Sequence, residues 1–446
     1  MGAATATAAS SAGQDGETTS WPVPGLERRL RTALDFASVA VESFGEAGYV
    51  DEERPALSFR PEKVLAEAAM LAHAAQGSTS GAGVEDRLRA LIAQLEPHVR
   101  SAAALADMAI HPDQVFKRAV PHVLLHGLGS VSREFDDFAA DRCEAVVRHA
   151  SDQPATVMAE RRWLASLWPR LRTRTGAPAA GAPLDLPHDL RTESREDAYG
   201  LTHTLFYETD FARRPPRGAV AARRDAVLVD VEGLLARYLD HGDYDLLGEL
   251  LMAWPELRVP WSPAAAFTFG VLARVEDEVG VLPCGNVDPV RLAALSGAGR
   301  TRYARAASYH TALVMGFLSA ATLRTALPLS AGPAQATPSA WKPFRALVDE
   351  SDTSQWLDVF DDRPHHQRDA LAPLVRDLAL AQAMRHDDVA RAGELLATAT
   401  RLGMPSSAME RAATDWLWSI HRAMELSGGT AGRTPVTPTL SESSPG

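Results

Sequence analysis

Hydrophobic residues recur at helical spacing along most of this chain, and strand-like alternation is scarce. A short apolar run at 226–229 is the one stretch with strand character, and the helical period on both sides includes it. The spacing predicts helices over 24–46, 61–75, 84–108, 113–127, 132–150, 155–171, 195–210, 218–240, 243–253, 263–280, 299–325, 370–384, 387–402 and 405–425. We therefore expect an all-α fold of paired antiparallel helices that form an irregular α/α toroid or solenoid.

Three segments flank or interrupt this pattern. Residues 1–22 and 427–446 contain few large apolar side chains, so we expect disordered tails at both ends. Residues 173–194 are rich in Gly, Ala and Pro, which predicts a linker or loop between an N-terminal helical half, 23–172, and a C-terminal helical half, 195–426. No fixed sequence period is visible, so a regular repeat is not expected.

The 57 acidic residues outnumber the 45 basic residues and give a net charge of −12. This balance argues against a general nucleic-acid binder, which needs a basic face. We expect no membrane span, because no apolar run reaches about 18 residues. Abundant Ala and Arg with only three Lys is typical of a high-GC actinobacterium. We expect a cytoplasmic protein whose partner is a small molecule or another protein, and neither nucleic acid nor a membrane.

A stripe of polar residues lies on the predicted helix 195–210, whose other faces are largely apolar. Tyr199, His203, Tyr207 and Asp210 are spaced i, i+4, i+8 and i+11, which places them on one face. An unpaired buried polar group costs on the order of 1–3 kcal/mol, so the protein or a ligand must supply partners. In a catalytic site His203 would be the acid or base, Asp210 would orient it, and the tyrosines would position substrate. The alternative is a structural network around a buried histidine.

Three further histidines are candidates for related chemistry. His310 follows Tyr309 at the start of an apolar stretch, and we expect its helix to face the polar stripe across a pocket, with His310 binding substrate. The alternative is a histidine of the core. His122 and His126 have the i, i+4 spacing of zinc helices, but no glutamate base lies between them. We assign no metal ligands, and only convergence of this pair with His203 or His310 would favour a metal site.

The acidic run at 134–141 has the form of the aspartate-rich motif of helical terpene synthases. That chemistry requires a second metal motif, which the sequence lacks, so we predict a solvated helix face. The phosphate-binding GxxxxGK[ST], dinucleotide-binding GxGxxG, HExxH and GxSxG motifs are absent as well. No cofactor is therefore assigned.

The block 197–211 is similar to the signature of an uncharacterised all-helical family of actinobacteria. In that signature Thr-His is followed by an aromatic pair and then by Thr-Asp-Phe-Gly. The matching residues here are Thr202, His203, Phe206, Tyr207, Thr209, Asp210 and Phe211. Ala212 stands where the signature has glycine. The family has no assigned activity, so the resemblance implies a helical fold and no mechanism.

The polar stripe favours a protein with an interior small-molecule pocket lined by the Tyr/His/Tyr/Asp stripe. The pattern leaves open whether the bound molecule is also transformed. The alternative is a helical-repeat protein-interaction module or scaffold without catalytic activity, in which the stripe is a satisfied part of the core.

Overall fold

The computed structural model describes residues 21–149, 155–168, 170, 189–192, 194–285, 287–330, 337–350 and 355–426. Within these ranges the regular structure is helical, and extended pairing is limited to two isolated bridges, Tyr49–Phe59 and Trp261–Leu329. The all-α prediction is confirmed. The toroid or solenoid arrangement remains a prediction.

The first half of the described chain contains the helices α1 (Val23–Phe44), α2 (Pro61–Ala75), α3 (Ala82–Val99), α4 (Ala102–Ile110), α5 (Val115–Gly127), α6 (Arg133–His149), α7 (Ala155–Leu167), α8 (Arg195–Thr209), α9 (Gly218–Ala222) and α10 (Arg224–His241). The second half contains α11 (Tyr244–Leu251), α12 (Ala253–Leu257), α13 (Pro263–Val279), α14 (Pro289–Ala294), α15 (Gly297–Thr325), α16 (Lys342–Arg345), α17 (Trp356–Asp361), α18 (His365–Ala370), α19 (Ala372–Arg385), α20 (Val389–Arg401) and α21 (Ala408–Leu426).

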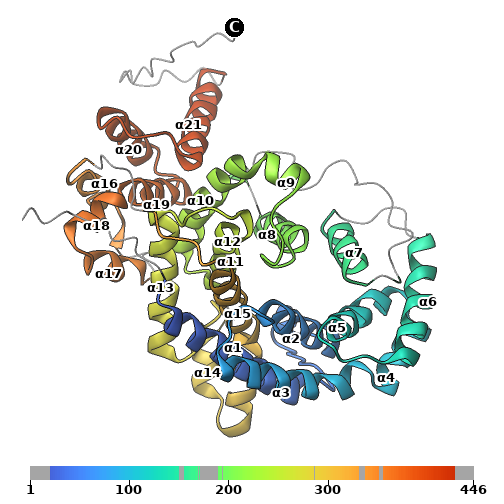
Figure 1. The fold of residues 1–446 in the computed structure, drawn as a ribbon. Helices are drawn as coiled ribbons and strands as arrows, with labels where there is room; N and C mark the ends of the chain where they lie inside the picture. Colours follow the sequence, from blue (N-terminus) through green and yellow to red (C-terminus); the bar gives the residue numbers. More distant parts are fainter. Residues whose placement is uncertain are drawn as a thin grey trace, which may run out of the picture.

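The long helix α15 is the centre of the packing. Most of its residues between Tyr303 and Thr322 are buried, on all sides of the helix, as expected for a helix surrounded by others. Helices α1, α2, α11 and α12 pack against it (Figure 1). Because α2 and α11 both contact α15, polar groups on these helices can meet at one place.

Two glycines allow the helices around α15 to approach closely. A Cβ added at Gly316 of α15 would come within 2.5 Å of the Ala33 Cβ on α1. A Cβ added at Gly248 of α11 would come within 2.5 Å of Cγ1 of Val314 on α15. Both separations are far shorter than van der Waals contact, so the observed packing requires positions without a side chain.

Two predicted helices are each divided in two. The predicted helix 84–108 corresponds to α3 and α4, and Ser101 separates them by accepting a 3.1 Å hydrogen bond from the backbone N–H of Ala104. The predicted helix 218–240 corresponds to α9 and α10, which meet at Arg223. In both places apolar positions continue at near-helical spacing, so the period alone does not detect the break.

The predicted tails and most of the predicted linker lie outside the described residues. Trp21, within the predicted N-terminal tail, is described, and its ring centroid lies 5.0 Å from that of Trp261 and 4.5 Å from that of Phe269. Leu190, within the predicted linker, is buried against α10 at Gly233. Ordered packing therefore extends into both segments, and the division into two helical halves remains a prediction.

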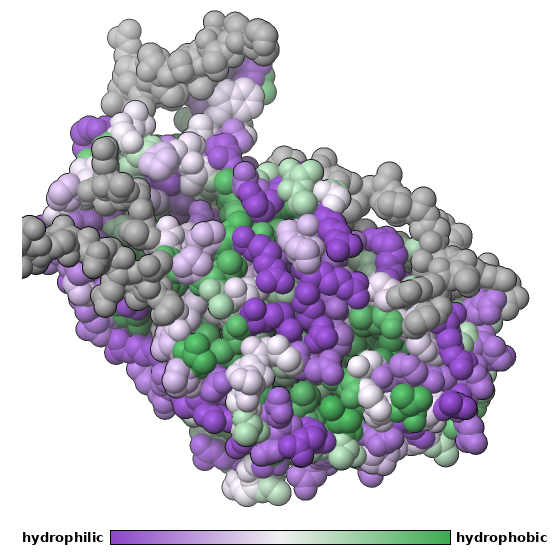
Figure 2. Space-filling view, viewed as in Figure 1, coloured by the Kyte–Doolittle hydropathy of each residue, from purple (hydrophilic) through white to green (hydrophobic). Residues whose placement is uncertain are grey.

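Helices α16–α21 gather at one end of the molecule, where α19 contacts α10, α16, α20 and α21 (Figure 1). The face in Figure 2 is mainly hydrophilic, with hydrophobic residues in several separate areas. None of the described helices combines the length and the apolar character needed to cross a membrane.

Candidate functional site

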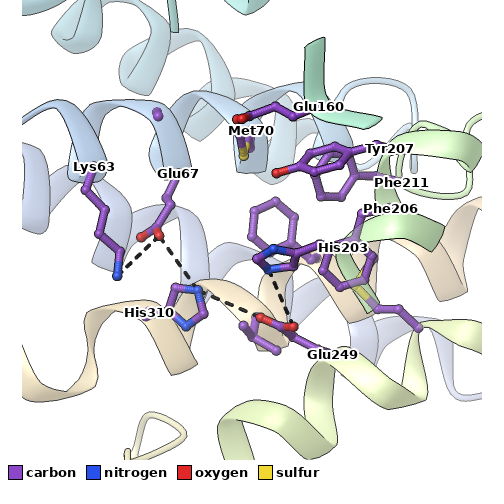
Figure 3. A pocket seen from close by; sticks show the side chains of 14 residues that line it. Lys63, Glu67, Met70, Glu160, His203, Phe206, Tyr207, Phe211, Glu249 and His310 are labelled. Atoms are coloured by element: carbon purple, nitrogen blue, oxygen red, sulfur yellow. Dashed lines mark ion pairs between the residues drawn. The ribbon is translucent and has the colours of Figure 1, made fainter. Parts of the chain in front are cut away.

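A cavity of about 200 Å³ lies between α2, α7, α8, α11 and α15 (Figure 3). One part of its wall carries polar and titratable side chains, namely Lys63, Glu67, Glu160, His203, Tyr207, Glu249 and His310. The other part is apolar and consists of Ala66, Met70, Phe206, Phe211, Met252, Val314 and Phe317. The cavity therefore offers a ligand both polar groups and apolar surface.

A buried carboxylate holds His310 at this wall. Nδ1 of His310 lies 2.7 Å from Oδ1 of Asp245, whose side chain is 7% exposed. The hydroxyl of Thr311 donates to the same oxygen at 3.1 Å, and the hydroxyl of Tyr199 donates to the other oxygen, Oδ2. These bonds join α8, α11 and α15, and they leave Nε2 of the His310 ring free to face the cavity.

The surrounding carboxylates keep His310 charged. Burial lowers the pKa of the imidazole, but Asp245, Glu67 and Glu249 outweigh burial and raise this pKa to about 10. Burial likewise favours the neutral acid of Asp245, but the His310 cation outweighs it and holds the pKa of this carboxyl below its usual range. At neutral pH the pair is therefore an imidazolium and a carboxylate.

Four titratable groups from four helices face one another across the polar part of the cavity. Nε2 of His310 lies 3.7 Å from Oε1 of Glu67 and 3.9 Å from Oε1 of Glu249, and Nε2 of His203 lies 3.7 Å from Oε2 of Glu249 (Figure 3). These separations exceed hydrogen-bond lengths. Oε2 of Glu249 also accepts a 2.6 Å hydrogen bond from the hydroxyl of Thr202. Across the described residues, no group of three or more His, Cys, Asp or Glu is arranged to hold a metal ion.

His203 also favours its charged form. Burial lowers the pKa of its ring, but the negative charge of Glu249 outweighs burial, so the pKa lies above the usual value. The His203 side chain is 38% exposed, so it contacts solvent as well as the cavity. It is therefore the titratable ring of this site that is best placed to exchange a proton with solvent.

Glu160 and Tyr207 add two further titratable groups to the wall of the cavity. Burial raises the pKa of the Glu160 carboxyl. Burial and the nearby charge of Glu160 raise the pKa of the Tyr207 hydroxyl well above its usual value. Tyr207 is consequently a hydrogen-bond donor that stays protonated at neutral pH.

The four residues of the predicted polar stripe on α8 do not all line the same cavity. His203 and Tyr207 line the cavity, together with His310 from α15. Tyr199 lies beside the cavity, where it bonds to Asp245 and where the guanidinium of Arg195 lies 4.6 Å from its ring centroid. The fourth member, Asp210, lies on a different surface.

The helix ends before it can bring Asp210 to His203. α8 ends at Thr209, and Asp210, Phe211 and Ala212 have φ values of 53°, 54° and 60°. This left-handed turn ends the helix and costs roughly 1–2 kcal/mol for each non-glycine residue. Ala212 adopts the left-handed conformation although it replaces the glycine of the similar signature. Phe211 then points into the cavity, whereas Asp210 does not line it.

Asp210 bonds to groups of α2 and α7 and does not orient His203. Its Oδ1 lies 2.8 Å from Nε2 of His73 and accepts a 2.7 Å hydrogen bond from Nε1 of Trp163. The expectation that Asp210 orients His203 is thus not met by the geometry. The carboxylate beside His203 is Glu249, from α11.

His122 and His126 belong to a separate buried cluster. Nε2 of His122 lies 2.8 Å from Oδ1 of Asp136, and Nδ1 of His126 lies 3.3 Å from Oδ2. Burial lowers the pKa of His122 to about 4, so this ring is neutral at pH 7. Neither ring lines the cavity with His203 and His310, so the four histidines do not converge. Asp136 is 2% exposed, which corrects the expectation of a fully solvated acidic face.

Sequence reasoning missed the carboxylates of the site. Asp245 and Glu249 are spaced i, i+4 in a helix rich in leucine, and two acids on one face of such a helix are a usable signal. Glu67 follows Lys63 by four residues, which resembles an ordinary solvated ion pair. Glu160 precedes two arginines and has no distinguishing pattern.

A family model described as a domain of unknown function matches residues 30–320. The matched region includes every residue that lines the cavity and ends before α16–α21. No curated protein and no solved structure matches this sequence.

Proposed function

The chain belongs to the family of domains of unknown function DUF6895, and on the geometry of its cavity we propose that it binds and transforms a small molecule. The site of both events is the cavity between α2, α7, α8, α11 and α15. The ligand places a polar group among Glu67, His203, Glu249 and His310 and an apolar part against Phe206, Phe211 and Phe317.

One observation carries this proposal. Four titratable groups face a common space at separations of 3.7–3.9 Å, too long for mutual hydrogen bonds, while Asp245 holds His310 and Thr202 holds Glu249. Glu67 also has two protein neighbours, Lys63 at 3.8 Å from its Oε1 and the buried hydroxyl of Tyr309.

The arrangement supports general acid–base chemistry. His310 is held as a cation by Asp245, so its Nε2–H donates to, and stabilises, negative charge on the ligand. His203 is partly exposed and exchanges its proton with solvent, so it is the group that transfers a proton to or from the ligand. Tyr207 supplies a neutral donor at the opposite side. The reaction class is proton transfer at a polar group of a small organic molecule.

The volume of the cavity limits the ligand. At about 200 Å³ it is smaller than the roughly 300–1,000 Å³ pockets that hold drug-sized molecules. The ligand is therefore a small metabolite rather than a nucleotide or a peptide. An interaction module, the alternative function, would have no use for titratable groups directed into a cavity of this size.

The proposal is tested by affinity selection with the full chain. The protein is incubated with the small-molecule extract of its source cells, unbound compounds are removed by ultrafiltration, and retained compounds are identified by mass spectrometry. We compare the wild type with Met70→Trp, which fills the cavity from the half-buried wall of α2, and with His366→Ala, an exposed control.

The expected result is at least one compound that the wild type and His366→Ala retain and Met70→Trp does not. A circular-dichroism melt of each variant shows that the chain is folded. Equal retention by all three proteins, or no retained compound, would contradict the proposal and favour the interaction module.

A further inference from the structure

A second cavity, of about 360 Å³, lies on the other side of the turn that follows α8. Its wall consists of His73, Gln76, Val123, Leu124, Gly127, Leu167, Asp210, Arg213 and Arg214. The two cavities are neighbours through adjacent residues, since Phe211 lines the first and Asp210 the second. This second cavity plays no part in the proposed function.

Guanidinium groups outnumber carboxylates at this cavity. Asp210 is the sole carboxylate among the described residues of its wall. Nε of Arg214 lies 3.5 Å and Nε of Arg213 lies 3.7 Å from Oδ2 of this carboxylate. Arg258 and Arg324 are close enough for their charges to act on the same cluster. Asp210 therefore cannot balance the positive charge around it.

Two of these arginines are held in place by the end of α2. Arg213 donates from Nη1 to the carbonyl of His73 at 2.6 Å. Arg324 donates from Nη2 to the carbonyls of Ala74 and Gln76, both at 2.7 Å. These carbonyls are the ones that a helix leaves without partners at its C-terminus, so they fix the guanidinium groups before any ligand binds.

The arginine cluster around Asp210 (Arg213, Arg214, Arg258 and Arg324) carries more positive charge than Asp210 neutralises, and it includes an N–H group without a hydrogen-bond partner. Burial and the charge of Arg213 lower the pKa of Arg324 to about 10. Nε of Arg324 is buried and has no hydrogen-bond partner. Burial also keeps the pKa of the His73 ring below its usual value, so this ring donates from Nε2 to Asp210 and adds no positive charge of its own. A bound anion would relieve the repulsion between the guanidinium groups.

We propose that the second cavity binds an anionic group, a phosphate or a carboxylate, through the guanidinium group of Arg214, with the charge of Arg213 beside it. The side chains of Arg213 and Arg214 are 24% and 40% exposed, so an anion reaches them from solvent. A guanidinium presents paired N–H groups that match two oxygens of a phosphate or carboxylate. Val123, Leu124 and Leu167 would contact the organic part of the ligand.

The test is isothermal titration of the full chain, at constant ionic strength, with inorganic phosphate and separately with acetate. The central variant is Arg214→Gln, because Arg214 makes no bond to the α2 carbonyls and its removal leaves that helix end intact. Arg217→Gln, an exposed neighbour on the same segment, is the matched control. Arg214→Lys keeps the charge and removes the paired N–H geometry.

We expect saturable binding of at least one anion to the wild type and to Arg217→Gln. Arg214→Gln weakens this binding at least tenfold, and Arg214→Lys gives an intermediate affinity. The anion that binds more tightly identifies the class of ligand. Unchanged binding to Arg214→Gln, or no saturable binding of either anion to the wild type, would overturn the proposal. Met70→Trp fills only the first cavity, so this variant should still bind the anion as the wild type does. Anion binding therefore tests the second cavity independently of the ligand retention that tests the first.

Discussion

Nδ1 of His310 lies 2.7 Å from Oδ1 of Asp245, and this bond connects the central helix α15 to α11 at the wall of the candidate ligand cavity. Tyr199 of α8 donates to the same carboxylate, so three helices share one buried charge. The pair fixes the orientation of the imidazole and keeps it protonated. It therefore links the stability of the fold to the chemistry of the site.

The first prediction concerns the pH dependence of stability. The folded-state pKa of His310 is about 10, above the usual value of 6.5, because burial is outweighed by Asp245, Glu67 and Glu249. The resulting stabilisation is fully present below pH 6.5 and is lost as the pH rises through 10. Across this window the folded state holds one more proton than the unfolded state, so the free energy of unfolding falls by up to about 1.4 kcal/mol per pH unit.

Chemical denaturation of the wild type and of His310→Gln from pH 6 to pH 10 measures this effect. The variant lacks the titrating group, so the stability difference between the two proteins shrinks as the pH rises. A difference that stays constant across the range would show that the imidazole has no raised pKa.

A second prediction concerns Asp245→Asn, which preserves shape and removes the charge. His310 then has a weaker partner, so its pKa falls and the buried pair is broken. Breaking such a pair costs about 3–5 kcal/mol of unfolding free energy. Asp362→Asn removes an exposed ion pair with Arg274, for which we expect a much smaller loss because solvent screens both charges.

Urea denaturation gives both free energies, and ¹³C NMR of labelled histidine rings gives the direction of the His310 shift. A cost for Asp245→Asn no greater than that of Asp362→Asn would refute the structural role of the pair.

The third prediction uses two glycines of the same helix. A methyl group at Gly316 meets the Ala33 Cβ at 2.5 Å and Cδ1 of Leu71 at 2.8 Å, so Gly316→Ala forces α1, α2 and α15 apart. We expect a loss of about 1–3 kcal/mol. Gly299→Ala meets no atom within 4 Å, so its better helix propensity should stabilise the protein by up to about 1 kcal/mol.

Thermal melts of the two variants distinguish packing from propensity, since both replace glycine by alanine in α15. A lower melting temperature for Gly316→Ala and a higher one for Gly299→Ala would support the close approach of these helices. A shift in the same direction for both would contradict it.

The fourth prediction concerns Asp210→Asn. Asparagine tolerates the left-handed conformation at this position, so the substitution isolates the effect of charge. The amide group keeps one acceptor for His73 and Trp163 but loses its attraction for Arg213 and Arg214. We expect a loss of about 1–3 kcal/mol in urea denaturation. No loss of stability would show that the carboxylate does not hold the turn after α8.

The helical period predicted the fold class because each helix must bury an apolar face, and this requirement repeats along the whole chain. It did not predict the break at Ser101, where the apolar positions continue and a single side-chain cap starts the next helix. It also did not predict that α8 ends before Asp210, since three non-glycine residues in left-handed conformation have no distinct sequence pattern. Such local features depend on tertiary contacts.

For the site, the sequence placed His203 and Tyr207 on one helix face and suggested that His310 lies opposite, and the structure brings these three side chains to one cavity. Their partners Glu67, Asp245 and Glu249 come from other helices, and no local spacing reveals which histidine each carboxylate meets. Charge pairing across helices becomes visible only after the helices are packed. The roles of these residues in binding or catalysis remain proposals.

The claim that His203 serves a ligand-binding cavity is tested most directly with His203→Ala, by measuring stability and ligand retention on the same preparation. The His203 ring is partly exposed and lies 3.7 Å from Glu249, so its removal should lower the free energy of unfolding by less than about 1 kcal/mol. The compound retained by the wild type should be lost. A loss of about 3 kcal/mol or more with retention unchanged would show that the ring belongs to the core, which is the strongest result against a functional cavity.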